Sequence, residues 1–247
     1  MTYVGARLMA AVFRSIGIDA EATPESDDRT LEFGGLYSSG EECYPEKVTM
    51  GDFLRIIHSD DFDRDRTAFF MPTAEGPCRF GQYAPYLRQV LDELGYEDVP
   101  IFSPTSRDSY DGFADHGQDV MRQMWRGLVC SDILRKMLLK TRPYETEVGA
   151  ADDAFERGIG IVEAVLERPQ TPSRDRLAGL AEALRQAREL FRGVPARYVR
   201  GKPLIGVVGE IFCRLNTFSN YDAVRKIEAH GGEAWMSDVS EWVWYTN

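Results

Sequence analysis

Cysteine and histidine are scarce in this sequence, with four and three copies among 247 residues. The four cysteines are widely spaced, and no Cys-x2-Cys or His-x3-His pair is present, which argues against a disulfide framework and a structural zinc site. Gly-x-Ser-x-Gly, Walker and Gly-x-Gly-x-x-Gly motifs are also missing, so the sequence gives no sign of a serine hydrolase or of those nucleotide sites. We therefore expect the cysteines to be free, metal-binding or reactive.

Basic residues and long apolar runs are also in short supply. Lysine and arginine number 29 against 40 acidic residues, which gives a formal net charge of −11. A field of this sign repels phosphate backbones and anionic lipid surfaces, so we expect neither nucleic acid nor a membrane as a partner. Because no apolar run reaches the roughly 18 residues of a spanning helix, and no signal-peptide pattern opens the chain, we expect a cytoplasmic protein.

What the sequence does contain is an ordinary globular mixture, 43% hydrophobic and 28% charged, long enough to bury a core without disulfides. The patterns predict a mixed α/β protein with three regions. Residues 1–118 alternate helical and extended patterns, residues 119–200 are helical, and residues 201–247 restart the α/β alternation. Alternating strands and helices favour βαβ units with a largely parallel sheet.

The elements of the first region are predicted from apolar spacing. The clearest is a helix over 81–94, where apolar residues recur at i, i+3, i+4 and i+7, followed by Gly95 as a stop signal. The other predicted elements of this region are helices over 6–16 and 48–57 and strands over 18–22, 67–71 and 99–102.

The remaining regions are read in the same way. In the second region, the spacing of apolar residues predicts amphipathic helices over 120–140, 154–166 and 176–191. The third region predicts a strand over 203–212, a helix over 221–229 and a strand over 233–236. The start of a second α/β lobe is therefore expected over 201–247.

Cys43 is the first candidate for chemistry, because it stands just before a predicted helix. Pro45 suits the first turn of that helix. A thiol near a helix N-terminus has its thiolate form favoured by the unsatisfied N–H groups, and thiolate is the form that binds metal. The alternative for Cys43 alone is a small buried hydrophobic residue, which is what most free cysteines are.

Cys78 is the second candidate, and it strengthens the first. It lies in a Gly76-Pro77-Cys78-Arg79 loop between a predicted strand end and the helix over 81–94. In open α/β sheets the ligand site lies outside the carboxyl ends of the strands. We expect Cys43 and Cys78 to hold equivalent places on successive βα units, and the loop glycines to let the backbone approach a bulky inorganic group. A cluster usually needs three or four protein ligands, and these are two.

The other two cysteines are weaker candidates. Cys130 lies in an apolar helical context and is expected in the core. Cys213 stands at the end of the predicted strand 203–212, and it either faces the carboxyl edge of the sheet or points away from it. Arg79 suits a cluster or an acyl-CoA phosphate, and an ion pair with one of the acidic residues is an equal alternative.

Four motifs in this order resemble a known family: Cys43-Tyr-Pro-Glu-Lys-Val-Thr-Met-Gly-Asp52, Gly76-Pro-Cys-Arg-Phe-Gly-Gln-Tyr83, Arg142-Pro-Tyr-Glu145 and Gly209-Glu-Ile-Phe-Cys-Arg-Leu-Asn-Thr-Phe-Ser-Asn220. They resemble the acyl-CoA dehydratase activase-related proteins, whose C-terminal portion is akin to the 2-hydroxyacyl-CoA dehydratase subunits. The resemblance runs from about residue 6 to residue 247.

The resemblance implies a Rossmann-like lobe with a low-potential iron–sulfur cluster, of the 4Fe-4S type, held by Cys43 and Cys78. It implies that Gly76, Pro77 and Arg79 border this cofactor. Such systems couple ATP hydrolysis on an activase domain or chain to one-electron transfer, which drives a radical dehydration or a difficult reduction of an acyl-CoA.

Two departures from the family pattern matter. The family's next cysteine motif would lie beyond residue 247, and the activase ATPase domain has no counterpart in this sequence. We expect a missing C-terminal lobe or a second dehydratase-like subunit to complete the site. The rival interpretations are a non-redox scaffold that docks to an activase, and an enzyme that uses Cys78 as a nucleophile, for which the sequence offers no convincing general base.

Overall fold

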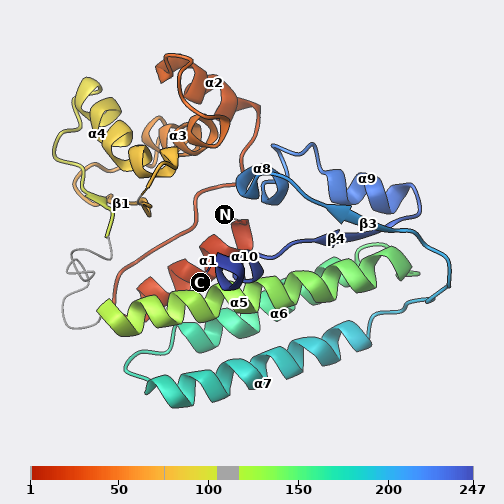
Figure 1. Ribbon diagram of the computed structural model, residues 1–247. Helices are drawn as coiled ribbons and strands as arrows, with labels where there is room; N and C mark the ends of the chain where they lie inside the picture. Colours follow the sequence, from red (N-terminus) through yellow and green to blue (C-terminus); the bar gives the residue numbers. More distant parts are fainter. Residues whose placement is uncertain (1, 75, 105–116, 247) are drawn as a thin grey trace. The chain divides into compact units, whose positions relative to one another are not determined.

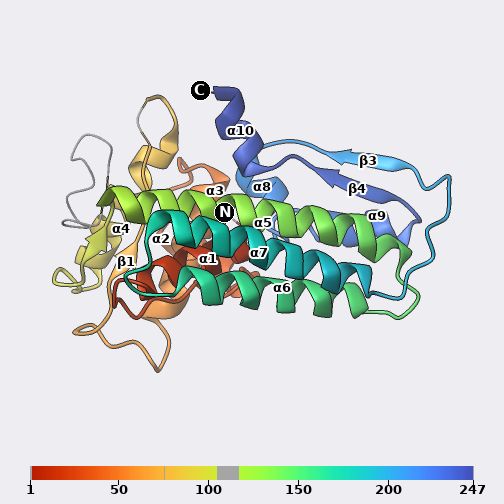
Figure 2. The same cartoon turned by 90° about the horizontal axis from the view of Figure 1, so that it is seen from below.

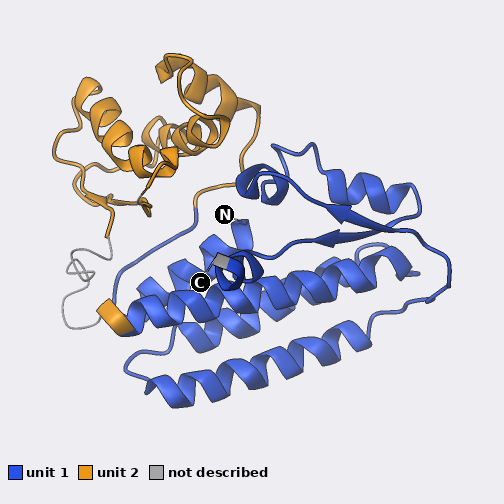
Figure 3. Cartoon of the chain, viewed as in Figure 1, with its two compact units in different colours: residues 1–22, 119–247 blue, residues 23–118 orange. Residues whose placement is uncertain are grey.

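The computed structural model describes residues 2–74, 76–104 and 117–246 (Figure 1). It is a mixed α/β structure, dominated by helices, with two small parallel sheets of two strands each among the described residues. The chain divides into two compact units, residues 23–118 and residues 1–22 together with 119–247 (Figure 3). Among the described residues, no helix combines the length and the apolar character needed to cross a membrane.

Among its described residues, the 23–118 unit is built around three helices and one short strand pair. Its elements are α2 (Asp28–Tyr37), α3 (Tyr44–Ile57), β1 (Phe69–Phe70), the 3-10 turn η1 (Arg79–Gln82), α4 (Tyr83–Glu93) and β2 (Ile101–Phe102). β1 pairs in parallel with β2. The strands lie inside the predicted segments 67–71 and 99–102 but have only two residues each, so the parallel sheet is much smaller than the sequence predicted.

Two predictions for the start of the chain need correction. The strand predicted over 18–22 is absent, because Gly17 adopts a left-handed φ of 87° and the segment after it has no strand partner. The helix α2 was not predicted, because its Gly34-Gly35 pair suggests a turn. Its N-terminus is fixed by a capping box in which the Asp27 carboxylate accepts from the Thr30 N–H, while the Thr30 hydroxyl accepts from the Asp27 N–H.

Helices α2 and α3 pack at a distance that only glycine permits. A Cβ atom on Gly51 would lie 1.9 Å from the carbonyl oxygen of Thr30, and one on Gly34 would lie 2.2 Å from the carbonyl oxygen of Lys47. Both neighbours are backbone atoms, so a side chain at either position would force the helices apart. This close crossing fixes the connection over residues 38–43, which carries Cys43.

A half-buried carboxylate, that of Asp52, also joins α3 to the start of α2. Asp52 accepts hydrogen bonds of 2.8 Å from the hydroxyls of Ser26 and Thr30. Burial raises the pKa of Asp52 to about 6 from an ordinary value of 3.8, although these hydroxyls and the Arg55 guanidinium lower it. Because the unfolded chain releases this proton at a lower pH than the folded chain, stability contributed by Asp52 is lost as the pH rises from about 4 through 6.

We expect Asp52→Asn to remove this pH dependence. Relative to the wild type, the variant should gain up to about 3 kcal/mol in free energy of unfolding between pH 4 and pH 7, since each pKa unit corresponds to about 1.4 kcal/mol. Urea unfolding of both proteins at the two pH values measures the difference, and Asp61→Asn, at an exposed position, serves as the control. An unchanged difference between pH 4 and pH 7 would refute the assignment.

The core of the 23–118 unit lies between α3, α4 and the strand pair. It is formed by buried side chains that include Met50, Phe53, Leu54, Phe69, Leu87, Val90, Leu91 and Val99. The predicted helix over 81–94 is present as η1 followed by α4, and the i, i+3, i+4 spacing of its apolar residues matches the buried face. This core positions the loops that precede α3 and η1.

The second unit is a layer of long helices: α1 (Tyr3–Arg14), α5 (Gly117–Thr141), α6 (Ala150–Leu166) and α7 (Ser173–Arg192). Figure 2 shows α5, α6 and α7 running side by side. The sequence placed α1 in the first lobe, but it packs with this unit. Leu8 and Val12 are fully buried, and Arg7 forms a 2.9 Å ion pair with Glu163 of α6.

The same unit contains the second parallel pair. Its elements are β3 (Leu204–Val207), α8 (Ile211–Leu215), α9 (Ala223–Ala229), β4 (Glu233–Met236) and α10 (Val239–Thr246). The strand predicted over 203–212 ends early, because Gly209 adopts a φ of 131° and the Glu210 carboxylate caps α8 by accepting from the Cys213 N–H at 2.8 Å. Cys213 therefore lies in a helix and not at a strand end, contrary to the prediction.

Arg142, in the third of the family-like motifs, holds the second parallel pair to the helices. Its side chain is buried, and it forms ion pairs of 2.7 Å with Glu228 of α9 and 2.9 Å with Asp152 of α6. The guanidinium of Arg142 is thus paired with two carboxylates, which offsets the free-energy cost of burying its charge. The arginine is therefore a structural residue within the unit.

Candidate functional site

Cys43 stands at the N-cap of α3, as the sequence predicted. Its thiol is half-buried and packs against the core of the 23–118 unit. Pro45 occupies the first turn of the helix, and the Cys43 backbone N–H acts to lower the pKa of the Glu46 carboxyl. Cys43 thus stands directly before the first turn of a 14-residue helix.

The element before Cys43 differs from the prediction. Cys43 follows helix α2, so it does not occupy the end of a βα unit. The equivalence of Cys43 and Cys78 on successive βα units is therefore wrong, because α2 takes the place of the expected strand. What the two residues share is the N-cap of a helical segment within the same compact unit.

Cys78 lies beyond the carboxyl end of β1, as predicted, and is the N-cap of η1. Gly76, Pro77, Cys78 and Arg79 are all exposed. Gly76 has a left-handed φ of 91°, which turns the chain back toward η1. The loop is compact, because the Gly81 N–H donates to the Cys78 carbonyl oxygen at 3.3 Å.

The two cysteine loops are joined by Arg79 and Tyr83. Arg79 donates a hydrogen bond to the carbonyl oxygen of Glu41, two residues before Cys43. The hydroxyl of Tyr83 lies 3.2 Å from the sulfur of Cys43. The pKa of Tyr83 lies above its ordinary value. Burial is the largest cause, and the hydrogen bond with Cys43 and the charges of Cys43, Glu46 and Cys78 act in the same direction. The thiol that contacts this hydroxyl is that of Cys43.

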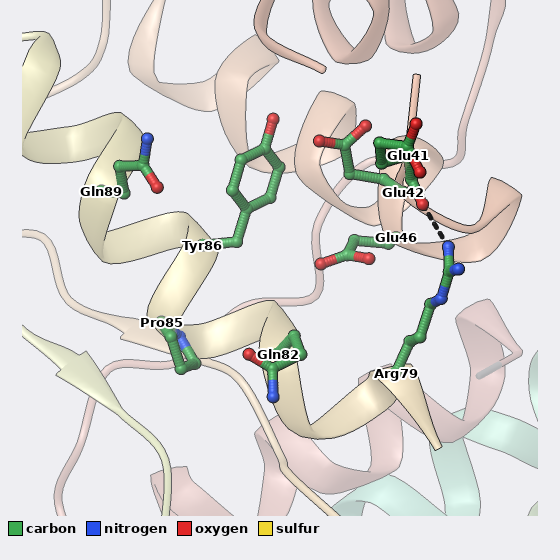
Figure 4. Close-up of a pocket in the computed structure, with 8 residues that line it drawn as sticks. All are labelled: Glu41, Glu42, Glu46, Arg79, Gln82, Pro85, Tyr86 and Gln89. Atoms are coloured by element: carbon green, nitrogen blue, oxygen red, sulfur yellow. Dashed lines mark hydrogen bonds between the residues drawn. The ribbon is translucent and has the colours of Figure 1, made fainter. Parts of the chain in front are cut away.

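A hollow of about 350 Å³ lies beside these loops (Figure 4). Its lining comes from the segment that carries Cys43 and from η1 and α4. The residues are Glu41, Glu42, Glu46, Arg79, Gln82, Pro85, Tyr86 and Gln89. Figure 4 shows the side chains of Glu42, Glu46 and Arg79 gathered on one side of the hollow. The carboxylates of Glu41, Glu42 and Glu46 outnumber the single guanidinium of Arg79, so this wall of the hollow is acidic.

The pKa values of Glu42 and Glu46, two of the carboxyl groups in this wall, are shifted in opposite directions. Burial raises the pKa of Glu46, and the charge of Glu42 adds to the effect, while the Cys43 N–H and Arg79 oppose it. Burial also acts to raise the pKa of Glu42, but hydrogen bonds from Ser39 and Gly40 lower it to about 2. Glu42 is therefore ionised throughout the physiological range.

The other cysteines take no part in this arrangement. Cys130 is buried in α5, as predicted, and burial raises the pKa of its thiol to about 12. Cys213 is half-buried in α8, which belongs to the other compact unit. Arg79 donates its hydrogen bond to a backbone carbonyl, and its place beside a cluster or an acyl-CoA phosphate stays a prediction.

Cys43 and Cys78 fit an iron–sulfur cluster in ligand type, since thiolates are its usual protein ligands. Within residues 2–74, 76–104 and 117–246, no group of three or more Cys, His, Asp or Glu side chains could hold a metal ion.

Sequence reasoning missed Tyr83 and Glu46 as members of this site. Both stand inside the quoted motifs, Tyr83 as the last residue of Gly76-Pro-Cys-Arg-Phe-Gly-Gln-Tyr83 and Glu46 three residues after Cys43. Their role depends on how α4 packs against α3. Comparison of the chain with models of known families, with curated proteins and with solved structures finds no match.

Proposed function

We propose that this chain is an iron–sulfur electron-transfer module of the 2-hydroxyacyl-CoA dehydratase/activase type. It takes part in the ATP-driven, low-potential reduction or radical dehydration of an acyl-CoA. Cys43 and Cys78 are the thiolate ligands of a 4Fe-4S cluster, with Gly76, Pro77 and Arg79 beside it. The bound cluster supplies one-electron chemistry at low potential.

The observation that supports this proposal most is the pairing of the two cysteine loops. Both thiols stand at helix N-caps of one compact unit. Arg79 ties the loop of Cys78 to the segment before Cys43, and Tyr83, which begins the helix after that loop, contacts the sulfur of Cys43. An accidental pair of structural cysteines would not need this shared arrangement.

The acidic wall of the hollow suits a low-potential centre. A reduced cluster carries one more negative charge than an oxidised one, and nearby carboxylates disfavour that charge. Glu42 stays ionised because the pKa of its carboxyl is about 2. The exposed loop around Cys78 leaves one side of the site open to a protein that delivers or takes the electron.

The remaining ligands come from outside the described residues under this proposal. A second dehydratase-like subunit or a C-terminal lobe would supply them, and an activase ATPase domain or chain would supply the electron. The strand pairs β1–β2 and β3–β4 would be the centres of two Rossmann-like lobes, and the complex would work in the cytoplasm.

Anaerobic purification tests this proposal. The protein is reconstituted with iron, sulfide and a small thiol that can fill open ligand positions, and its iron content and visible spectrum are recorded. We expect brown protein with about four irons per chain, as a 4Fe-4S cluster requires. Colourless protein that remains folded by far-ultraviolet circular dichroism would reject the redox role.

The non-redox scaffold is the alternative, and one surface favours it. Strand β3 and the residue directly after it expose apolar side chains, with Leu204 60% and Val208 79% accessible. Exposed apolar residues on an open strand suit the addition of a partner strand. Binding of the colourless chain to a purified activase, lost in a Leu204→Lys variant, would support this role.

A further inference from the structure

Strand β3 has one backbone edge to which no described strand is paired. On its other side, the N–H of Glu233 in β4 donates to the carbonyl oxygen of Pro203 at 2.9 Å. Backbone groups of alternate residues point to the same side of a strand, so those of Leu204 and Gly206 face away from β4. No further strand joins this pair among the described residues. Figures 1 and 2 both show β4 between β3 and α5, with β3 outside.

This free edge, formed by the backbone groups of Leu204 and Gly206, has room for another strand. The side chains of Leu204 and Val208 are mostly exposed, and a Cβ atom on Gly206 would meet no atom within 4 Å. The four residues of β3 include no charged residue and no proline, which are the usual means of blocking an exposed edge. Parallel sheets are normally covered and larger than two strands. The edge therefore suits strand addition.

The segment that leads into β3 is basic, although the chain as a whole is acidic. Residues 197–209 include Arg197, Arg200 and Lys202 and no acidic residue, whereas the net charge of the chain is −11. Arg197 and Arg200 are exposed, and neither forms an ion pair with the described residues. The ammonium of Lys202 lies over the ring of Tyr144, 5.6 Å from its centroid. Charges at the rim of a binding surface select a partner of opposite charge.

We propose that the free edge of β3 binds an extended acidic segment of a partner protein, which joins the sheet as a third strand. Its backbone pairs with Leu204 and Gly206, its apolar side chains cover Leu204, and its acidic end lies beside Arg197 and Arg200. The inference specifies the partner chemistry of the surface described for the scaffold alternative. It does not rest on the iron–sulfur role.

Peptide selection identifies the preferred segment. Random peptides of about twelve residues, long enough to span the strand and its basic flank, are displayed on phage and selected against the full, metal-free chain. We expect enriched peptides to alternate β-branched or aromatic residues with polar ones and to carry clustered Asp or Glu at one end. Failure to enrich any peptide, or enrichment without the acidic cluster, would overturn the inference.

Variants then test the surface by fluorescence anisotropy with the strongest enriched peptide. Leu204→Lys should weaken binding at least about tenfold, because a charged residue on an edge opposes strand pairing. Arg197→Glu combined with Arg200→Glu should weaken it about tenfold and reduce its dependence on salt. The matched controls are Leu177→Lys, at a position 49% exposed in α7, and Arg157→Glu, at an exposed position in α6. Both should bind as the wild type does.

Amide exchange followed by NMR shows whether the peptide adds as a strand. The N–H groups of Leu204 and Gly206 should exchange at least about tenfold more slowly when the peptide is bound. Those of Ile205 and Val207, which face β4, should change little. Unchanged exchange at Leu204 and Gly206 would contradict strand addition, and equal weakening in the control variants would contradict the assigned surface.

A second copy of the chain is the competing occupant. Sedimentation of the free protein as a dimer, with the N–H groups of Leu204 and Gly206 already protected, would assign the edge to that copy and overturn the inference. Every measurement uses the metal-free chain, so a failure to assemble a cluster would count against the proposed function and leave this test unaffected.

Discussion

Gly51→Ala should destabilise the 23–118 unit by more than about 3 kcal/mol. A methyl group at this position would lie 1.9 Å from the carbonyl oxygen of Thr30, 2.8 Å from its carbonyl carbon and 3.1 Å from the amide nitrogen of Gly34. All three atoms belong to the backbone of α2, so the clash can only be relieved if the helices separate. Overpacking by a methyl group usually costs about 1 to 3 kcal/mol where side chains can move, and here they cannot.

Two other glycine substitutions are matched controls for this prediction. Gly35→Ala, next to the crossing, would meet only the flexible end of Lys47 at 3.4 Å, and Gly160→Ala in α6 would meet nothing within 4 Å. Both should be neutral or stabilising by about 0.5 to 1 kcal/mol, because alanine favours a helix over glycine. Urea unfolding followed by circular dichroism measures all three. A Gly51→Ala variant as stable as Gly35→Ala would show that the helices do not cross so closely.

The Gly51→Ala substitution should also affect the candidate site. The connection over residues 38–43 leads from α2 into α3 and ends at Cys43. Helices that separate would release this connection. We therefore expect the same variant to disturb the position of Cys43.

The second large effect is on iron binding. Cys43→Ala and Cys78→Ala should each reduce the iron bound after reconstitution to below about a tenth of the wild-type amount, since the chain would keep one thiolate ligand. Alanine is close to cysteine in size, so neither variant should disturb the core. Iron content and the visible absorbance of the cluster give the measurement.

Cys213→Ala is the control for iron binding. Cys213 is half-buried in the other compact unit, and we expect its variant to bind as much iron as the wild type. Equal iron in all three variants would show that neither Cys43 nor Cys78 is a ligand. Equal loss in all three would point to a general effect on folding, which circular dichroism would reveal.

The helices with strong apolar spacing could be predicted from the sequence, because one face of each is buried. The segments 81–94, 120–140 and 154–166 became η1 with α4, α5 and α6. Helix α2 was missed because its Gly34-Gly35 pair suggests a turn, whereas in the structure Gly34 lies against the backbone of α3. The segment 18–22 has apolar residues typical of a strand, but no neighbouring strand pairs with it.

The site was predicted in part. Cys43 and Cys78 are marked by local signals, a proline in the first helical turn and a Gly-Pro loop. Tyr83 and Glu46 carry no such signal, because a tyrosine or a glutamate at a helix start is ordinary. Their place beside the thiols depends on how α4 packs against α3. The topology was also wrong for Cys43, since the sequence could not show that a helix precedes it.

The convergence of two sulfurs on one site is tested most directly by cross-linking in the metal-free protein. Dibromobimane becomes fluorescent when it joins two neighbouring thiols, and peptide mapping identifies them. We predict a fluorescent product in which Cys43 is joined to Cys78 within one chain, at a rate independent of protein concentration. Separate alkylation of the two cysteines, with no joined peptide, would contradict a shared sulfur site.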